Sequence, residues 1–404
     1  MKKSLFAVAF GSLALVSCSS DDVSTAQEPD YTGKSILEIE TVVDGLTKSN
    51  VEGIMAGGTP WEDGDRIRIF ALDYDKYMAD GFVVKYTGAD FMNKGFQYLA
   101  DSRTWQHVDN QPILLSNLKA RLYAFSPSFG ELTDGFNYNG DGALNPKRIP
   151  LTFNTPNKID FLYGTHRNTA DGQTDQSGDN MTDGGGSQND NGAMFSYVDN
   201  KNPLVRLYMK HAQTCVRIRL AKEAVNPDKL YTGKGQVTAL EVMQLKKTTS
   251  SYGNTVYEPA DNAQTHGAAL PANGYIDITK TEDNITPLEW KVATMTDLID
   301  GVDKKDFILN PTLGNGAAPQ YNEAFALLAP CKEDMVRGFH LLVDDVHFYV
   351  PCSTDEKPKE WKAGFTYTYD LVLTGKSLEM SSGEDGDVVT VKPWNDGGTY
   401  PGEF

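Results

Sequence analysis

Short runs in which every second residue is apolar recur along the chain and constrain its fold more than any other feature. In one of them Ile67, Ile69 and Ala71 fall on the same face of an extended strand, while Arg66 and Arg68 fall on the other. Similar runs, divided by turn residues, occupy 66–72, 82–86, 96–99, 118–125, 274–279, 325–328, 339–350 and 365–374. This spacing predicts a mainly all-β chain built from β-sandwiches.

The domain organisation follows from length and composition. Helical periodicity is weak and predicts only short helices, at 221–225 and 297–301. A length of 404 residues is typical of two domains, which we place at 35–198 and 199–404. Residues 170–193 lie near this boundary and consist almost entirely of small polar residues that cannot bury apolar surface. They indicate a mobile loop; their aspartates also suggest calcium, but the spacing does not match an EF-hand loop.

The first residues form a leader of the secretory type. Two lysines precede Leu5–Val16, an apolar segment too short to span a bilayer. Ser17 and Cys18 then resemble the lipobox of bacterial lipoproteins, in which the leader is cut before the cysteine and acyl chains such as palmitate are attached to it. Two or more such chains give stable anchoring. We therefore expect a signal peptide at 1–17 and a membrane-anchored chain beginning at Cys18. An ordinary leader with an incidental cysteine is the alternative.

The residues after the leader are acidic, as is the whole chain. Residues 18–34 predict a flexible tether, although the run Ser19–Asp22 also resembles acidic signals that send some lipoproteins to the cell surface. The formal net charge is −18, and it becomes −20 without residues 1–17, whose only charges are two lysines. Such a chain is repelled by phosphates, so nucleic acid is excluded as a partner. The lipid must therefore supply the contact with a membrane.

The run Leu204–Leu220 changes phase in its middle. Apolar residues occupy odd positions up to 209 and even positions from 212 onward. A slip of one residue around Lys210-His211 predicts a β-bulge. His211 and Cys215 suggest a metal pair, but no further His or Cys lies close in sequence, so we interpret them as strand residues. We expect no metal ligands and no cofactor.

The cysteines after the leader are too few for a disulfide scaffold. They are Cys215, Cys331 and Cys352. Asp344-Asp345 predicts a hairpin turn, which places Cys352 opposite Arg337. Six residues of extended chain, about 20 Å, then separate Cys331 from Arg337. A disulfide needs Cα atoms within about 7 Å, so a Cys331–Cys352 bond is disfavoured but stays open in an oxidising compartment.

Six short motifs follow one another along nearly the whole chain. They are the lipobox at Cys18, Trp61-x-x-Gly64-Asp65, Tyr123-Ala-Phe-Ser-Pro127, Asp160-Phe-Leu-Tyr163, Leu207-x-x-x-His211 with Val216-x-Ile218, and Pro393-Trp394. In this order they resemble the fimbrillin (type V pilin) family of Gram-negative anaerobes, including its Mfa-like branch. The resemblance implies two β-sandwich domains of transthyretin-like topology, export as a lipoprotein, and a role as a fimbrial stalk, anchor or tip subunit.

The resemblance also implies a way of assembling. In such subunits a protease removes the first strand, and a strand of the next subunit fills the vacated groove by β-augmentation. The removable strand here is Ile36–Leu46, with Leu37, Ile39, Thr41 and Val43 on one face. We expect fimbrial subunits to be partners through this strand addition.

The processing site and the donor strand are expected after the first strand and near the C-terminus, respectively. The loop after the first strand contains Lys48, so a trypsin-like cut falls between Lys48 and Ser49, because the nearest arginine, Arg66, lies in the next predicted strand. The donor is a C-terminal strand, Val388–Lys392. Few residues follow Trp394, which slightly favours a tip or accessory subunit over a stalk subunit, unless the last strand itself swings out.

An enzyme and a binding lipoprotein are the two alternatives to a fimbrial subunit. No G-x-S-x-G, H-E-x-x-H, P-loop or Rossmann motif is present, and acidic pairs such as Asp63 and Asp65 are explained by turns, so we do not expect an enzyme. The alternative is a non-polymerising surface lipoprotein that binds a glycan or a host protein. Trp105 or Trp361 could stack on sugars there, unless they lie in cores. In either case we expect the chain at the outer membrane and cell surface.

Overall fold

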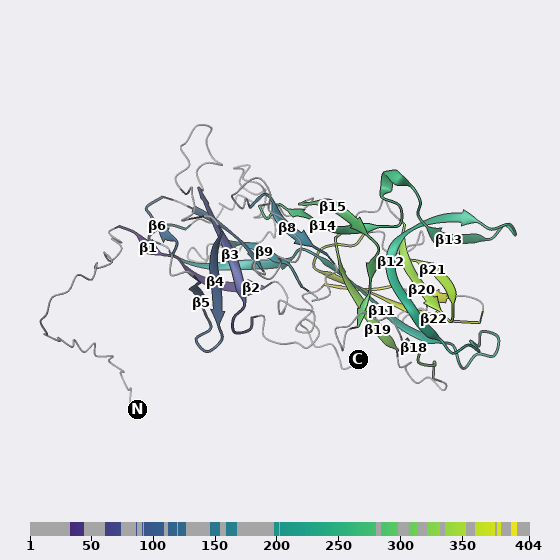
Figure 1. The fold of residues 1–404 in the computed structure, drawn as a ribbon. Helices are drawn as coiled ribbons and strands as arrows, with labels where there is room; N and C mark the ends of the chain where they lie inside the picture. The colour runs from purple at the N-terminus through teal and green to yellow at the C-terminus, as the bar shows by residue number, and fades with distance from the viewer. Residues whose placement is uncertain are drawn as a thin grey trace, which may run out of the picture. The chain divides into compact units, whose positions relative to one another are not determined.

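Strands make up nearly all of the regular structure, so the predicted all-β class is confirmed (Figure 1). The chain divides into residues 1–32 and 33–404, and every described residue belongs to the second unit. The computed structural model describes residues 33–43, 61–73, 86, 91, 93–108, 112–118, 120–126, 146–153, 159–167, 198–201, 203–279, 284–297, 307–313, 321–331, 336–352, 360–375, 378–380 and 389–393. In these residues the only helix is the 3₁₀ segment Ala263–Thr265, and no helix is long and apolar enough to cross a membrane.

The largest sheet has seven strands and draws on residues both before and after 170–193. Its order is β2 (Glu38–Val43), β10 (Leu204–His211), β9 (Leu162–Arg167), β7 (Ala120–Ser126), β3 (Arg66–Asp73), β4 (Lys94–Leu99) and β5 (Thr104–His107). β2 and β10 run parallel, and the other neighbouring pairs are antiparallel. A separate pair, β1 (Ser35–Ile36) and β6 (Leu114–Leu115), is antiparallel.

Both faces of β3, an interior strand of this sheet, are covered by apolar side chains. Ile67, Ile69 and Ala71 are fully buried in one cluster, as predicted, and Arg66 is exposed. Phe70 is fully buried as well, in a second cluster on the other face. The alternating pattern alone did not indicate this second core.

Two six-stranded sheets form a β-sandwich in the C-terminal half. One has the order β17 (Thr296–Asp297), β19 (Asn322–Leu328), β11 (Thr214–Lys222), β22 (Phe365–Leu373) and β23 (Leu378–Met380), with β24 (Val389–Pro393) also on β22. The other has the order β13 (Thr255–Pro259), β12 (Gln236–Thr249), β20 (Arg337–Val343) and β21 (Val346–Pro351), with β16 (Ala293–Thr294) and β18 (Phe307–Ile308) on β12. Ile218 of the first sheet and Val242 and Leu341 of the second share one fully buried apolar cluster.

A three-stranded sheet joins segments that precede and follow 170–193. β8 (Ile149–Thr152) pairs with β14 (Leu270–Ile276), which pairs with β15 (Ile285–Lys291). The second cluster beneath Phe70 also includes Ile149 and Ile276 from these strands. The division into domains at 198/199 stays a prediction; β10, which follows it, belongs to the seven-stranded sheet.

The predicted β-bulge near Lys210-His211 is wrong. β10 ends at His211 and β11 begins at Thr214, so 204–220 is two strands in two different sheets. The apolar phase changes because each strand faces a different core, and the chain bends at Ala212-Gln213 between them.

The helix predicted at 221–225 is also wrong. β11 continues through Lys222 in register with β22, and the Glu223 carboxylate then accepts hydrogen bonds from the Val225 and Asn226 backbone N–H groups in a turn. Residues 82–85, 170–193 and 298–301 lie outside the described residues, so the strand, loop and helix predicted there stay predictions. Asp297, the start of the last of these, belongs to strand β17.

The predicted hairpin at Asp344-Asp345 is confirmed. Both residues have positive φ, +47° and +64°, which aspartate tolerates better than most side chains. The turn places Cys352 beside Arg337, whose carbonyl accepts the Cys352 N–H at 2.6 Å. Cys331 instead pairs through its backbone with Trp361. None of the three described cysteines forms a disulfide bond, as the extended geometry favoured.

The Asp344 carboxylate fixes this hairpin to the start of β12. It accepts hydrogen bonds from the Tyr231 hydroxyl at 2.8 Å and from the Gly235 and Gln236 N–H groups at 2.7 and 2.9 Å. Partial burial alone would raise the pKa of Asp344, but these hydrogen bonds outweigh it and lower that pKa below its ordinary value.

We expect Asp344→Asn to lower the free energy of unfolding at pH 7 by about 1–2 kcal/mol, because a neutral amide replaces a charged acceptor while still tolerating positive φ. Since the folded-state pKa is lowered, the stabilisation is present above the unfolded pKa of about 4 and is lost as the pH falls through the folded-state value. Urea unfolding at pH 7 and pH 3 measures both effects. Asp345→Asn, at the exposed position of the same turn, should change little. A deficit for Asp344→Asn that is equally large at both pH values would contradict this account.

Candidate functional site

The first strand lies at the edge of the seven-stranded sheet and changes its partner halfway along (Figure 1). Its beginning, β1, pairs with β6, and the Leu37 N–H donates to the Ile113 carbonyl at 3.0 Å. Glu38 N–H then donates to the Pro203 carbonyl at 3.0 Å, and β2 continues parallel to β10 up to Val43 opposite Met209. Among the strands that the structure describes, β2 therefore has one sheet neighbour, β10.

The side chains of this strand follow the predicted alternation. Leu37 and Ile39 are buried, with 2% and 7% of their surface exposed, in the cluster that includes Leu207 of β10. Glu38 and Glu40 are exposed. The apolar face is therefore directed into the core and the acidic face outward.

Two further contacts hold the strand in place. Trp105 of β5 is buried and donates its indole N–H to the half-buried Thr41 hydroxyl at 3.1 Å. At the other end, the Ser35 hydroxyl donates to the Asn200 carbonyl at 2.7 Å, and the Asn200 amide donates to the Gly33 carbonyl at 2.8 Å. Val43, the fourth residue predicted on the inner face, is placed here by its backbone pairing alone.

The surface beneath the first strand is apolar and has a free backbone edge if the strand is absent. Its walls include Ile113 and Leu115 on one side and Val205 and Leu207 on the other, all buried. Removing the strand would expose these side chains together with the outer N–H and C=O groups of β10. Such an edge pairs readily with another extended segment.

The predicted lipidation and processing residues lie outside the described residues; they are Ser17, Cys18, Lys48 and Ser49. Lys48 follows the end of β2 by five residues. Arg66 is the first residue of β3 and pairs with Gln97 of β4, as the prediction that it lies in a strand required.

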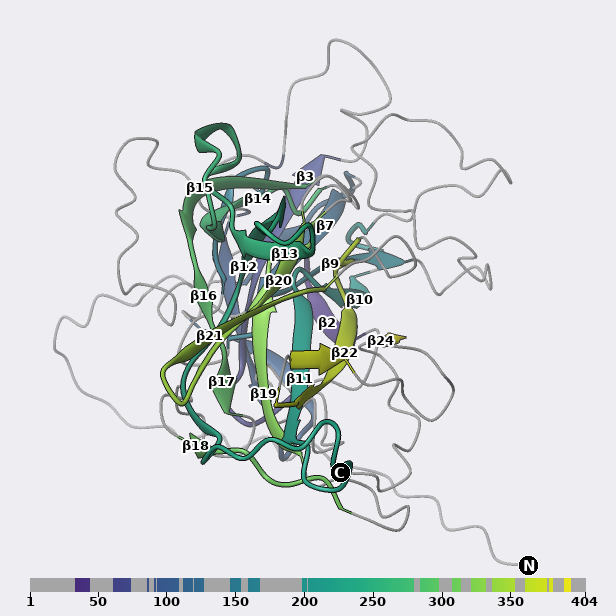
Figure 2. The same cartoon turned by 90° about the vertical axis from the view of Figure 1, so that its right-hand side faces the viewer.

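The predicted C-terminal strand is found at Val389–Pro393, one residue from its expected position, as β24 (Figure 2). It pairs antiparallel with the first half of β22, from Phe365 opposite Pro393 to Tyr369 opposite Val389. β23 covers the same edge of β22 farther along, at Leu371–Leu373. The other edge of β22 is held by β11 in parallel.

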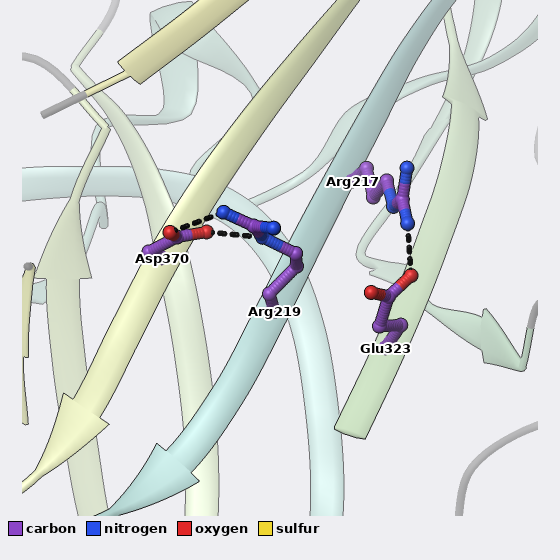
Figure 3. A network of polar contacts seen from close by, with 4 residues as sticks. All are labelled: Arg217, Arg219, Glu323 and Asp370. Atoms are coloured by element: carbon purple, nitrogen blue, oxygen red, sulfur yellow. Dashed lines mark hydrogen bonds and ion pairs between the residues drawn. The ribbon is translucent and has the colours of Figure 1, made fainter. Parts of the chain in front are cut away.

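Two arginines of β11 tie that sheet together across three strands (Figure 3). Arg219 donates two hydrogen bonds to the Asp370 carboxylate of β22, from Nε to Oδ1 at 2.6 Å and from Nη2 to Oδ2. Arg217, which is buried, reaches Glu323 of β19. Burial alone would lower the pKa of Arg219, but hydrogen bonding and the charge of Asp370 outweigh it and raise that pKa. We did not predict these ion pairs, although the two arginines, two residues apart in an otherwise apolar strand, were the available signal.

The remaining candidates from the sequence have structural roles. His211 places Nδ1 3.0 Å from the buried Asp160 carboxylate, whereas Cys215 lies on β11 with a thiol whose pKa burial raises to about 12. Both are strand residues, as we interpreted them. Within the described part of the chain, no three His, Cys, Asp or Glu side chains are grouped to hold a metal ion. Trp105 and Trp361 are buried, so stacking of sugars on them is excluded.

Solved structures similar to this chain come from Bacteroides and Porphyromonas species. A proposed cell adhesion protein from Bacteroides uniformis covers 91% of this chain and 100% of its own at 13% identity and a TM-score of 0.48. Another from Bacteroides ovatus covers 89% and 98% at 12% identity and a TM-score of 0.47. The fimbrial anchor protein Mfa2 from Porphyromonas gingivalis covers 88% and 97% at 8% identity and a TM-score of 0.34.

Comparison of the sequence itself gives the family. No curated protein matches it. A model of fimbrillin-like proteins, however, matches residues 54–394, a range that begins seven residues before Trp61 and ends at Trp394. Because this match spans most of the chain and includes five of the six motifs on which the resemblance rested, all but the lipobox at Cys18, the chain belongs to the fimbrillin-like family.

Proposed function

We propose that this chain is a structural subunit of a type V fimbria, exported as a lipoprotein and assembled by donor-strand exchange. As a member of the fimbrillin-like family it is a fimbrial-type adhesion protein of the cell surface. One observation carries the finer proposal: the first strand is an edge strand that supplies part of the core of the seven-stranded sheet. A strand of another subunit with the same alternation could take its place.

The energetics support exchange rather than simple loss. Burying Leu37 and Ile39 each contributes roughly 1.5–3 kcal/mol, and their removal would also leave the β10 edge unpaired. Loss of the strand therefore creates a site whose filling is favourable. An incoming strand parallel to β10 would restore both the hydrogen bonds and the apolar contacts.

Strand β24 is the donor that the chain itself offers. It lies on the edge of β22 and is joined to β22 only over Phe365–Tyr369, while β11 holds the opposite edge of β22. A stalk subunit would release β24 into the groove of its neighbour. A tip subunit would accept a strand and keep β24 in place.

Attachment to the outer membrane is assigned to Cys18. The leader, the small residue before the cysteine and the acidic tether support a lipid anchor of this kind. Adhesion to a host glycan or protein would then be a property of the assembled fibre. The non-polymerising binding lipoprotein is weaker, because the two tryptophans that favoured it are buried.

We expect protein sheared from cells to begin at Ser49 in the fractions that contain fibres, since Lys48 follows β2 in the sequence. N-terminal sequencing and intact mass, with electron microscopy of the same fractions, measure this. Lys48→Gln should keep the first strand and reduce fibre formation. Protein that stays acylated at Cys18 and full length in fibre-free fractions would overturn the proposal and favour a binding lipoprotein.

We also expect a chain that begins at Ser49 to bind a synthetic peptide of residues 35–46. At a peptide concentration of 100 Kd, binding adds about 2.7 kcal/mol to the free energy of unfolding, which a thermal scan detects as a higher Tm. Refolding with the peptide present serves if the shortened chain does not fold alone. The Ile39→Asp peptide should have no effect, whereas Glu38→Gln, at an exposed position, should act like the natural peptide. Equal stability with and without the natural peptide would show that no groove had formed.

A further inference from the structure

Four polar side chains form a row on the outer face of the sheet β13-β12-β20-β21. Glu241 of β12 lies directly opposite His340 of β20, which lies directly opposite Tyr349 of β21. His347 precedes Tyr349 by two residues on the same face of β21. The neighbouring residues Val242 and Phe339 face the buried core, so this row belongs to the opposite side of the sheet.

Hydrogen bonds connect three of these side chains in a line. His340 Nδ1 is 2.7 Å from Glu241 Oε2, and His340 Nε2 is 2.8 Å from His347 Nδ1. A carboxylate only accepts, so His340 donates from Nδ1, and in its neutral form its Nε2 then carries a lone pair. That lone pair is directed at His347, whose Nδ1–H donates to it.

The two imidazoles are held in fixed orientations. The ring of Tyr349 stacks on His340 at 4.8 Å between centroids, with 16° between the planes, and it is within 7° of parallel to His347. His340 is 8% exposed, whereas His347 is exposed, so the pair opens to solvent on the His347 side. An ion could therefore reach the two nitrogens without unfolding the sheet.

We propose that His340 and His347 bind one divalent transition-metal ion of the Zn²⁺ type, with Glu241 as the carboxylate that orients His340. The metal takes the place of the proton shared by His340 Nε2 and His347 Nδ1. The His347 proton moves through solvent to its exposed Nε2, so both rings stay neutral and each offers one lone pair. Imidazole nitrogens suit Zn²⁺, Cu²⁺ and Ni²⁺.

The geometry requires little change. Two nitrogens bound to a tetrahedral Zn²⁺ at about 2.0–2.1 Å are roughly 3.3 Å apart, compared with 2.8 Å here. A shift of about half an ångström at the exposed His347 side chain, together with a rotation of its ring that directs the Nδ1 lone pair at the ion instead of at His340, supplies the difference. Water completes the coordination, since no third His, Cys, Asp or Glu in the described residues is placed as a direct ligand.

Glu241 has the role that carboxylates commonly have beside metal-binding histidines. A ligating histidine donates its other N–H to a carboxylate, which fixes its tautomer, and removing that carboxylate typically weakens metal binding 10–100-fold. Here Glu241 already accepts from His340 Nδ1 without any metal. It is therefore a positioning residue in this proposal, not a ligand.

Zn²⁺ titration of the full chain, produced without an added histidine tag and treated with chelator, tests the site by isothermal calorimetry. We expect one Zn²⁺ per chain, loss of binding in His347→Ala and in His340→Gln, and at least tenfold weaker binding in Glu241→Gln. His266→Ala is the matched control, because His266 is an exposed histidine that stacks on Trp290 instead, and it should bind like the natural chain.

A thermal scan keeps the test independent of folding defects. Zn²⁺ should raise the Tm of the natural chain and of His266→Ala but not of His347→Ala, each compared with its own Tm without metal. Absence of Zn²⁺ binding to the natural chain would overturn the proposal. So would binding to His347→Ala with unchanged affinity.

Discussion

The short connection between β10 and β11 is the constraint on which the two large parts of the fold depend. Only Ala212 and Gln213 separate a strand of the seven-stranded sheet from a strand of the C-terminal sandwich, and both are buried. Gln213 accepts the Phe161 N–H through its side chain at 3.0 Å and the Gly364 N–H through its backbone carbonyl at 2.8 Å. The connection is therefore bonded to the start of β9 on one side and to the start of β22 on the other.

This connection also links the two ends of the proposed assembly chemistry. β10 pairs with the first strand along one edge, and β11 pairs with β22, which also pairs with β24. The pair Arg219–Asp370 holds β11 and β22 in register where the sheet is parallel. A force applied to a strand paired with β10 would be transmitted directly to β11, because only two buried residues connect β10 and β11.

How much the sequence predicts depends on whether a feature is local. Alternation located β3 and the inward side chains Ile67 and Ile69, and an Asp-Asp turn located the β20–β21 hairpin, since both depend on neighbouring residues alone. The same alternation led to the wrong prediction for 204–220, because a bulge and a chain that passes from one core to another produce the same change of phase. The burial of Phe70 was missed for the same reason: it depends on β8 and β14, which are distant in sequence.

The candidate site divides in the same way. The inward residues Leu37 and Ile39 were predictable, but their partner β10 begins more than 160 residues later and runs parallel, which no local pattern specifies. The hydrogen bond from Trp105 to Thr41 could not be predicted either, because the sequence around a tryptophan near a turn is the same whether the side chain packs in a core or faces solvent.

The first strand also limits what could replace it. Glu38 and Glu40 face outward on an edge strand, where charges discourage pairing with a further strand. Because side chains alternate along a strand, a slip of one residue would place such charges in the apolar cluster and expose the apolar side chains to solvent. A groove left by this strand would therefore strongly favour one register of an incoming strand. In the proposed exchange, an incoming strand would have to present apolar side chains at the positions of Leu37 and Ile39, whereas it could carry charge between them. Subunits that share one fold would in this way discriminate among extended segments.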